Sequence, residues 1–125
     1  MSGSDEDVLR FIAASFPSIW TLELLLTLRA ERRTWTREQL VTALRASDLV
    51  VSRALDALLA AGLASMDHDG ARYAPVNRDV DECMDRAEQL YRARPNAVRR
   101  TIIAATTSSA AAFANAFRLR RDTDD

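Results

Sequence analysis

Apolar residues recur along most of this chain at the three- and four-residue spacing that brings them onto one face of an α-helix. The spacing predicts helices over residues 5–15, 19–30, 37–45, 48–61 and 78–93, and it continues through 96–121. The segment 19–30 is apolar on nearly every side, so we expect other elements or a second subunit to cover it on more than one face. The hydroxyl residues 106–109 are compatible with a bend or with a continuous helix.

Residues that favour helix ends fall at the edges of these segments. Side chains suited to capping helix N-termini precede the first five helices: Ser4 or Asp5, Ser18, Thr36, Ser47 and Asn77. Thr36 and Gln39 form a capping box, in which each side chain accepts a hydrogen bond from the backbone of the other. Pro17 and Pro95 interrupt the helical pattern, and Gly62 suits a left-handed cap after the 48–61 helix.

Two short strand-like runs predict a hairpin between the fourth and fifth helices. They cover residues 63–67 and 71–76, and His68, Asp69 and Gly70 between them are typical of a tight turn. The segment 34–36 also favours an extended conformation. From residue 18 to 76 the predicted order is therefore helix, short strand, helix, three-residue turn, helix and β-hairpin.

This order of elements resembles the winged helix-turn-helix of bacterial transcriptional regulators. Residues 51–64, VSRALDALLAAGLA, carry the resemblance. They are similar to the pattern V-S-R-x-L-x-x-L-x-x-x-G-L-V of MarR-, PadR- and ArsR-like proteins. Val51, Leu55 and Leu58 have the spacing of a core face, and Gly62 is placed to reverse the chain. The resemblance covers roughly half of the chain.

The resemblance implies a mainly α fold with a small β-hairpin wing. Within one compact domain, it places a leading helix in residues 1–17, the winged helix-turn-helix in 18–76 and C-terminal helices in 77–121. It also implies a transcriptional regulator that binds double-stranded DNA as a homodimer. Such dimers place two recognition helices about 34 Å apart in successive major grooves.

The helix over 48–61 would be the recognition helix, and its chemistry suggests which residues contact DNA. Arg suits guanine and Ser suits any base, so the candidate base contacts are Ser47, Ser52 and Arg53. The candidate phosphate contacts are Arg37, Arg45 and Arg72. Two features oppose DNA binding. Asp48 would repel phosphates, and the turn 67–70 is acidic, whereas regulators that grip the minor groove usually carry Arg or Lys there.

Large apolar residues exceed what one small core accommodates, so some are candidates for a dimer interface. The candidates are Trp20, Leu24, Met84, Tyr91, Ile103, Phe113 and Phe117. Each of them is equally compatible with an ordinary core position. The leading and C-terminal helices resemble the dimerisation helices of MarR and PadR proteins, which favours a dimer for the chain as a whole.

The distribution of charge leaves a second class of function open. All 17 basic residues are Arg and the net charge is −1, yet residues 8–121 carry +5 because six acids lie at the two ends. Residues 86–121 hold eight Arg and one acid. This stretch suits an acidic protein partner as well as DNA, because the Arg fork pairs with carboxylates. The alternative function is a protein–protein interaction module that docks through Leu49 and Val50 and does not read DNA.

The sequence carries no motif of an enzyme, a metal site or a membrane protein. Cys83, the only cysteine, lies on the apolar stripe of its helix, so we expect it to be buried. The sole histidine, His68, lies beside two acids in a turn, and there is no glycine-rich phosphate loop. We expect no catalytic residue, metal or cofactor. The most apolar stretch, 8–28, is interrupted by two charges and a proline, so we expect a cytoplasmic protein without a membrane segment.

Overall fold

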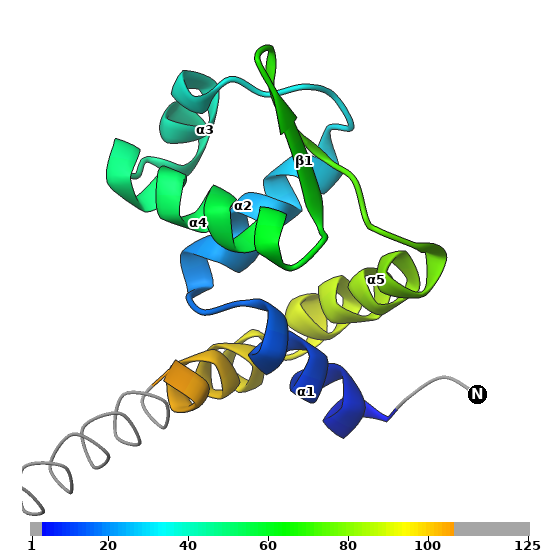
Figure 1. The fold of residues 1–125 in the computed structure, drawn as a ribbon. Coiled ribbons are helices and arrows are strands. Elements are labelled where there is room, and N and C mark those ends of the chain that lie inside the picture. The colour runs from blue at the N-terminus through cyan, green and yellow to red at the C-terminus, as the bar shows by residue number, and fades with distance from the viewer. Residues whose placement is uncertain (1–3, 107–125) are drawn as a thin grey trace, which may run out of the picture.

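A computed structural model of the chain describes residues 4–106, which are mainly helical with one small antiparallel sheet (Figure 1). The elements in chain order are α1 (Asp5–Ser15), α2 (Ile19–Ala30), α3 (Arg37–Leu44), α4 (Asp48–Ala60), β1 (Ala64–Asp67), β2 (Gly70–Tyr73) and α5 (Arg78–Ala93). A further helix covers residues 95–106. A mainly α fold with a small β-hairpin is therefore confirmed.

The first five helices begin at the polar residues that the sequence indicates. Each capping side chain accepts a hydrogen bond from the backbone N–H three residues later, and the capping residues are Ser4, Ser18, Thr36, Ser47 and Asn77. The predicted capping box of Thr36 and Gln39 is present, with N–O distances of 3.0 and 3.1 Å. These bonds satisfy N–H groups that have no partner inside the helix, which explains why local sequence signals locate the helix starts.

The second strand is shorter than predicted. β2 ends at Tyr73 because Pro75 has no N–H to donate to a neighbouring strand. Backbone pairing continues on either side of this proline. The N–H groups of Ala74 and Val76 donate to carbonyls of residues 62–63, at 3.1 and 2.8 Å. The predicted strand to residue 76 is therefore replaced by irregular chain that still pairs with residues 62–63, just before β1.

Pro95 separates two helices, as predicted, but it belongs to the second of them. The helix after α5 begins at residue 95, where proline is well tolerated because the first N–H groups of a helix have no internal partner. Helical structure continues to residue 106. The rest of the predicted helix, to residue 121, and the alternatives for 106–109 lie outside the described residues.

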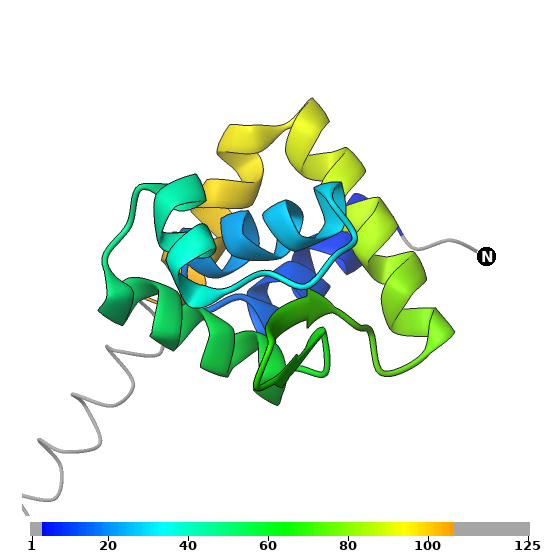
Figure 2. The same ribbon diagram turned by 90° about the horizontal axis from the view of Figure 1, so that it is seen from above.

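α2 lies at the centre of the fold and is covered from two sides. Figure 1 shows α3, α4 and the hairpin on one side of α2, with α1, α5 and the 95–106 helix on the other, and Figure 2 shows the same arrangement from above. Leu22, Leu24, Leu25 and Leu28 are fully buried, so this helix is covered on more than one face, as predicted. Within residues 4–106 no single helix is long and apolar enough to cross a membrane; α1 and α2 reach that length only as a pair bent by 102°.

One residue of the 34–36 segment pairs with the hairpin, in line with its predicted extended conformation. The Trp35 N–H donates to the Ala71 carbonyl at 2.7 Å, and the Ala71 N–H donates to the Trp35 carbonyl at 2.8 Å. Gly70 makes this approach possible, because a Cβ at residue 70 would lie 2.2 Å from the Trp35 carbonyl oxygen. The φ of Gly70 is +139°, which side chains rarely adopt. This glycine therefore determines both the turn and the contact of the hairpin with Trp35.

Replacement of Gly70 by alanine is expected to lower the free energy of unfolding by about 2–4 kcal/mol, because the methyl group would collide with backbone. Gly62→Ala is the matched control. Gly62 also has a positive φ, +73°, but a Cβ there would meet only the Val76 side chain, at 3.2 Å. For this control variant we expect the free energy of unfolding to fall by about 1 kcal/mol. Urea unfolding followed by circular dichroism measures both, and equal losses would contradict the role given to Gly70.

Candidate nucleic-acid interface

The three-residue turn between α3 and α4 sets the direction of α4. Arg45 ends α3 in the left-handed conformation, with a φ of 53°, and among residues 4–106 it is the only non-glycine residue with a positive φ. Ser47 then caps α4 and accepts a hydrogen bond from the Val50 N–H at 3.2 Å. Both predicted DNA contacts in the turn are exposed, so the structure places them together at the start of α4.

α4 packs on one side and faces solvent on the other. It contacts α2, α3 and β1, and its buried residues are Val51, Ala54, Leu55 and Leu58. Leu49, Arg53 and Asp56 recur at helical spacing on the exposed side, and Ser52 is half-buried at its edge. Leu49 is 58% exposed. The exposed side of α4 therefore combines one arginine, one hydroxyl, one carboxylate and one large apolar side chain.

Three of the four arginines predicted to contact DNA have no compensating partner. Arg37, Arg45 and Arg53 are exposed and form no ion pair with any described residue. Arg45 and Arg53 lie in the turn and on α4, whereas Arg37 begins α3. These guanidinium groups are available to an anion, because no carboxylate within the described chain neutralises them by direct contact.

Acids on the same two helices limit the net charge of this surface. Glu38, Asp48 and Asp56 are exposed, and they form no ion pair with the described residues either. Asp48 lies in the first turn of α4, where the helix dipole favours a negative charge. The three arginines and three acids cancel, so any nucleic acid would bind here through particular contacts rather than through a strong basic field.

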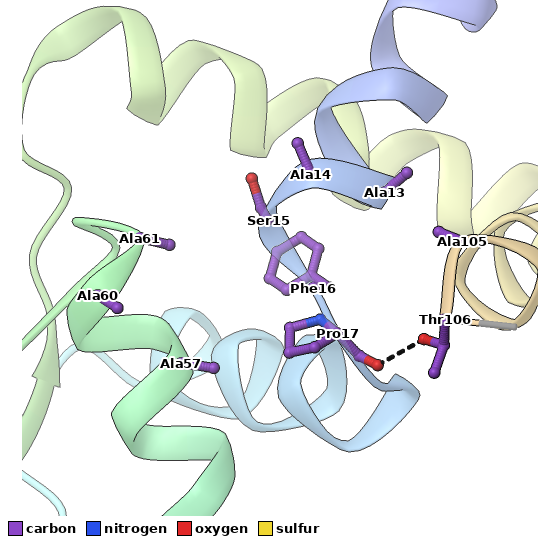
Figure 3. A pocket seen from close by; sticks show the side chains of 10 residues that line it. All are labelled: Ala13, Ala14, Ser15, Phe16, Pro17, Ala57, Ala60, Ala61, Ala105 and Thr106. Carbon is purple, nitrogen blue, oxygen red and sulfur yellow. Dashed lines mark hydrogen bonds between the residues drawn. The ribbon is translucent and has the colours of Figure 1, made fainter. Parts of the chain in front are cut away.

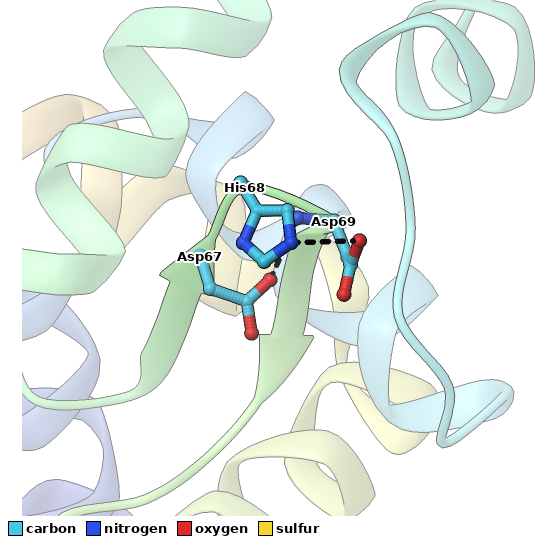
Figure 4. Close-up of side chains that lie close together, drawn as sticks. All are labelled: Asp67, His68 and Asp69. Carbon is cyan, nitrogen blue, oxygen red and sulfur yellow. Dashed lines mark hydrogen bonds and ion pairs between the residues drawn. The ribbon is translucent and has the colours of Figure 1, made fainter.

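The hairpin tip is acidic, and its single arginine is neutralised. Figure 4 shows Asp67, His68 and Asp69 clustered at the turn. Arg72 donates to the Asp67 carboxylate at 3.2 Å, so Arg72 adds no net positive charge to this surface. The backbone N–H of Asp69 also donates to Asp67, at 2.9 Å. This hydrogen bond, together with Arg72, holds the pKa of Asp67 below its usual value. Because Arg72 already has a carboxylate partner, it is less available to a phosphate than the unpaired arginines, and its predicted DNA contact stays a prediction.

The same tip has side chains that could bind a metal, but all of them are open to solvent. Asp67, His68 and Asp69 each offer one ligand atom, and these atoms lie within 4.8 Å of one another. All three side chains are exposed. Asp67 is already bonded to Arg72, and His68 Nε2 lies 3.4 Å from Asp69. Exposed acidic groups often lie this close without binding a metal, so the cluster gives no support to metal chemistry.

Two of the predicted dimer-interface residues are core residues. Leu24 and Met84 are fully buried within the chain, so they have no surface to offer a second copy, and the prediction is wrong for both. Their helical spacing is equally that of a covered face. Tyr91 is half-buried and donates through its hydroxyl to Glu23 at 2.5 Å. Phe113 and Phe117 lie outside the described residues.

Trp20 and Ile103 remain accessible, and they line one surface hollow. Trp20 is 39% exposed and Ile103 is 63% exposed. The hollow has a volume of about 460 Å³ and lies between α2, the end of α3 and the 95–106 helix. Its other lining residues include Leu44, Glu23 and Arg99. These two predicted interface residues are therefore brought together by segments that are far apart in the sequence.

A second hollow of similar size has no group suited to catalysis. It has a volume of about 470 Å³ and lies between the end of α1, α4 and the 95–106 helix (Figure 3). Six alanines, Phe16 and Pro17 make most of its lining, and Ser15 and Thr106 are the polar side chains. The Thr106 hydroxyl is bonded to the Pro17 carbonyl at 2.8 Å. Cys83 does not line it and is half-buried on α5, less than its place on the apolar stripe predicts.

The sequence did not indicate the cluster around Arg29, which joins α2 to α5 and the hairpin. The Arg29 side chain is 5% exposed and pairs with Asp85 and, at 2.5 Å, with Glu88. Its guanidinium carbon lies 5.0 Å from the centre of the Tyr73 ring, a cation–π contact. The Tyr73 hydroxyl donates to Asp81 at 2.5 Å. We call these five residues the Arg29 cluster.

The protonation states in the Arg29 cluster follow from burial and its charges. Burial lowers the pKa of Arg29, but the hydrogen bond to Asp85, Tyr73 and the charge of Glu88 together outweigh burial and raise the pKa. Burial raises the pKa of Tyr73 to about 12, and the hydrogen bond to Asp81 adds to this shift. Arg29 therefore stays charged and Tyr73 stays neutral at physiological pH. The signal that could have revealed this cluster in the sequence is a lone arginine in an apolar helix, together with acids at positions i, i+4 and i+7 of α5.

Comparison of this chain with known protein families, with curated proteins and with solved structures finds no match. The functional assignment therefore depends on the residues described above and on their geometry. Among the described surfaces, the turn before α4 and its exposed side bring together most of the predicted DNA contacts.

Removal of the Arg29 guanidinium is expected to destabilise the fold strongly. Arg29→Met should lower the free energy of unfolding by about 2–4 kcal/mol, because it leaves Asp85 without its ion-pair partner and Glu88 with only the exposed Arg92. Arg92→Met is the matched control, since Arg92 also pairs with Glu88, at 2.6 Å, but is 76% exposed. In that control variant the free energy of unfolding should fall by less than about 1 kcal/mol. Chemical unfolding measures both, and similar losses would contradict a structural role for the Arg29 cluster.

Tyr73 is expected to make stability fall at high pH. Its pKa in the folded chain is about 12, above the ordinary value of about 10 in the unfolded chain. The stability from its protonated hydroxyl is therefore complete below about pH 10 and is lost as pH rises towards about 12. Free energies of unfolding measured from about pH 9 to pH 11.5 should fall less for Tyr73→Phe than for the wild type. Tyr91→Phe, which keeps Tyr73, is the comparison: burial and the hydrogen bond to Glu23 also raise the pKa of Tyr91, but less, so its curve should lie between those of the wild type and Tyr73→Phe. Parallel curves for the wild type and Tyr73→Phe would contradict this assignment.

Proposed function

We propose that this chain is a DNA-binding transcriptional regulator that acts as a dimer through a winged helix-turn-helix. α2, the Trp35 segment, α3, the turn, α4 and the hairpin follow the order of that fold. The observation that carries the proposal is the exposed side of α4. It is presented by a helix whose other side is buried, and unpaired arginines lie at its start and along it.

The proposed contacts follow from the shape of DNA and from the chemistry of these side chains. A major groove about 12 Å wide admits an α-helix. Arg53 is suited to the O6 and N7 acceptors of guanine, and Ser52 to any base. Ser47 uses its oxygen as a cap, and its hydroxyl hydrogen is available to DNA. Arg45 and Arg37 would contact phosphates, whereas Arg72 is left out because Asp67 neutralises it.

The balance of charge predicts a particular kind of DNA binding. Each phosphate contact contributes about −0.9 to the slope of log affinity against log salt concentration. The two unpaired arginines assigned to phosphates on each subunit, Arg37 and Arg45, would then give a slope of about −2 per chain. The acidic hairpin tip adds repulsion rather than contacts. Affinity would therefore depend on base contacts and on the presence of two subunits more than on a field of positive charge.

A protein–protein interaction module is the second candidate, and the exposure of Leu49 favours it. Leu49 and the half-buried Val50 form an apolar spot at the start of α4, next to Asp48. An acidic partner for the arginines of α5 and the following helix has less support. Arg92 pairs with Glu88, and Arg94 pairs with Asp5, so the chain itself neutralises part of this charge.

The double variant Arg45→Ala/Arg53→Ala separates the two candidates. The DNA-binding proposal expects it to weaken binding of fluorescently labelled random duplex DNA by about 30-fold or more, measured by anisotropy at low salt. Arg78→Ala/Arg92→Ala is the matched control, because both arginines are ion-paired on α5, and it should bind as the wild type does. A wild type that binds no duplex at low salt, or a double variant with unchanged affinity, would overturn the proposal in favour of a protein partner.

A further inference from the structure

The hollow lined by Trp20 and Ile103 has an apolar part that the described chain leaves uncovered. Six large apolar side chains are exposed within residues 4–106, and two of them line this hollow. Leu44, at the end of α3, adds to the apolar lining. Trp is one of the residue types that are enriched among the energetic anchors of protein interfaces. We call this region the Trp20 surface, and it includes Trp20, Leu44, Ile103, Glu23 and Arg99.

A separated pair of opposite charges borders the same hollow. The Tyr91 hydroxyl donates to Glu23 Oε1 at 2.5 Å and accepts a hydrogen bond from Arg99 Nη2 at 3.2 Å. The tyrosine thus lies between the two charges, which form no direct ion pair with each other. Glu23 Oε2 and the other two nitrogens of Arg99 make no hydrogen bond within the described chain. Each charge therefore keeps part of its bonding capacity for a partner.

We propose that the Trp20 surface binds the same surface of a second copy of this chain. In a two-fold symmetric contact a surface must be complementary to itself. The Trp20 surface meets this condition, because it holds one carboxylate, one guanidinium, projecting apolar side chains and a hollow. Arg99 of each copy would pair with Glu23 of the other, and the Trp20 side chains would be covered by the contact.

A second copy fits this surface better than an unrelated partner does. Glu23 and Arg99 are both bonded to the Tyr91 hydroxyl, which fixes the spacing between their charges. A foreign surface would need a cation and an anion at the same spacing, with the cation facing Glu23 and the anion facing Arg99. A symmetry-related copy supplies that pair automatically. This inference deepens the dimer part of the proposed function and rests on it, and it does not depend on whether the dimer binds DNA.

Charge reversal tests the cross-pairing directly. Glu23→Arg and Arg99→Glu, each alone, would place like charges opposite each other. In an equimolar mixture of the two variants each substituted residue would face an opposite charge. Sedimentation velocity should therefore show a dimer for the wild type, monomers for each variant alone and a dimer for the mixture. Recovery on mixing also shows that both variants are folded.

Two further variants delimit the surface. Trp20→Ala should raise the dissociation constant of the dimer about tenfold or more, because it removes the apolar anchor. Arg100→Glu is the matched control: this arginine is exposed on the same helix, does not line the hollow, and should leave the dimer unchanged. Circular dichroism of each variant checks that its helical content is retained.

Each other outcome overturns the location of the interface, the cross-pairing or the dimer itself. A wild type that dimerises, with both charge variants still dimeric, would place the interface elsewhere and overturn the Trp20 surface while the dimer stands. Variants that dissociate but do not recover on mixing would overturn the cross-pairing. A wild type that stays monomeric at about 100 μM would overturn the dimer and leave the hollow to another kind of occupant. DNA binding, measured separately by anisotropy, stands or falls on its own in each case.

Discussion

Arg29 is the only charged side chain that the described chain buries, and its contacts join α2 to α5 and to the hairpin. The guanidinium lies against Tyr73 of β2 and pairs with Asp85 and Glu88 of α5. Apolar packing of α2 supplies most of the cohesion, but hydrophobic contact has no direction. Charge-assisted hydrogen bonds do have direction, and they fix how α5 and the hairpin lie against α2. Tyr91 and Glu23 add a second polar contact between the same two helices.

The candidate DNA surface depends on this frame in two ways. α2 supports α4 from behind, so the exposed side of α4 keeps one orientation. The hairpin is held through Tyr73 and through the pairing of Ala71 with Trp35, which requires Gly70. The charges of the surface cancel, and the hairpin tip is acidic. A regulator built in this way would depend on base contacts from α4 and on a second copy, which doubles those contacts, rather than on phosphate contacts from the hairpin.

Local signals predicted the helices and the hairpin well, because caps, turn glycines and apolar spacing act over a few residues. Contacts between distant segments were harder to predict. Apolar spacing showed that Met84 belongs to one face of its helix, but not that the chain itself covers that face. The pairing of Arg72 with Asp67 depends on strand register, and that of Arg29 with Glu88 spans 59 residues. Spacing within a single helix does not show which distant segment will cover its apolar face or pair with its charges. For this reason Leu24 and Met84 were wrongly expected at an interface.

A map of backbone amide chemical shifts, recorded as duplex DNA is added to the labelled protein, tests directly whether the start and exposed side of α4 form a DNA-binding surface. If they do, the largest changes are expected at residues 45–53, with smaller changes near Arg37 and almost none at the acidic turn 67–69. Changes concentrated at the hairpin tip or on α5, with residues 45–53 unaffected, would contradict this role of α4.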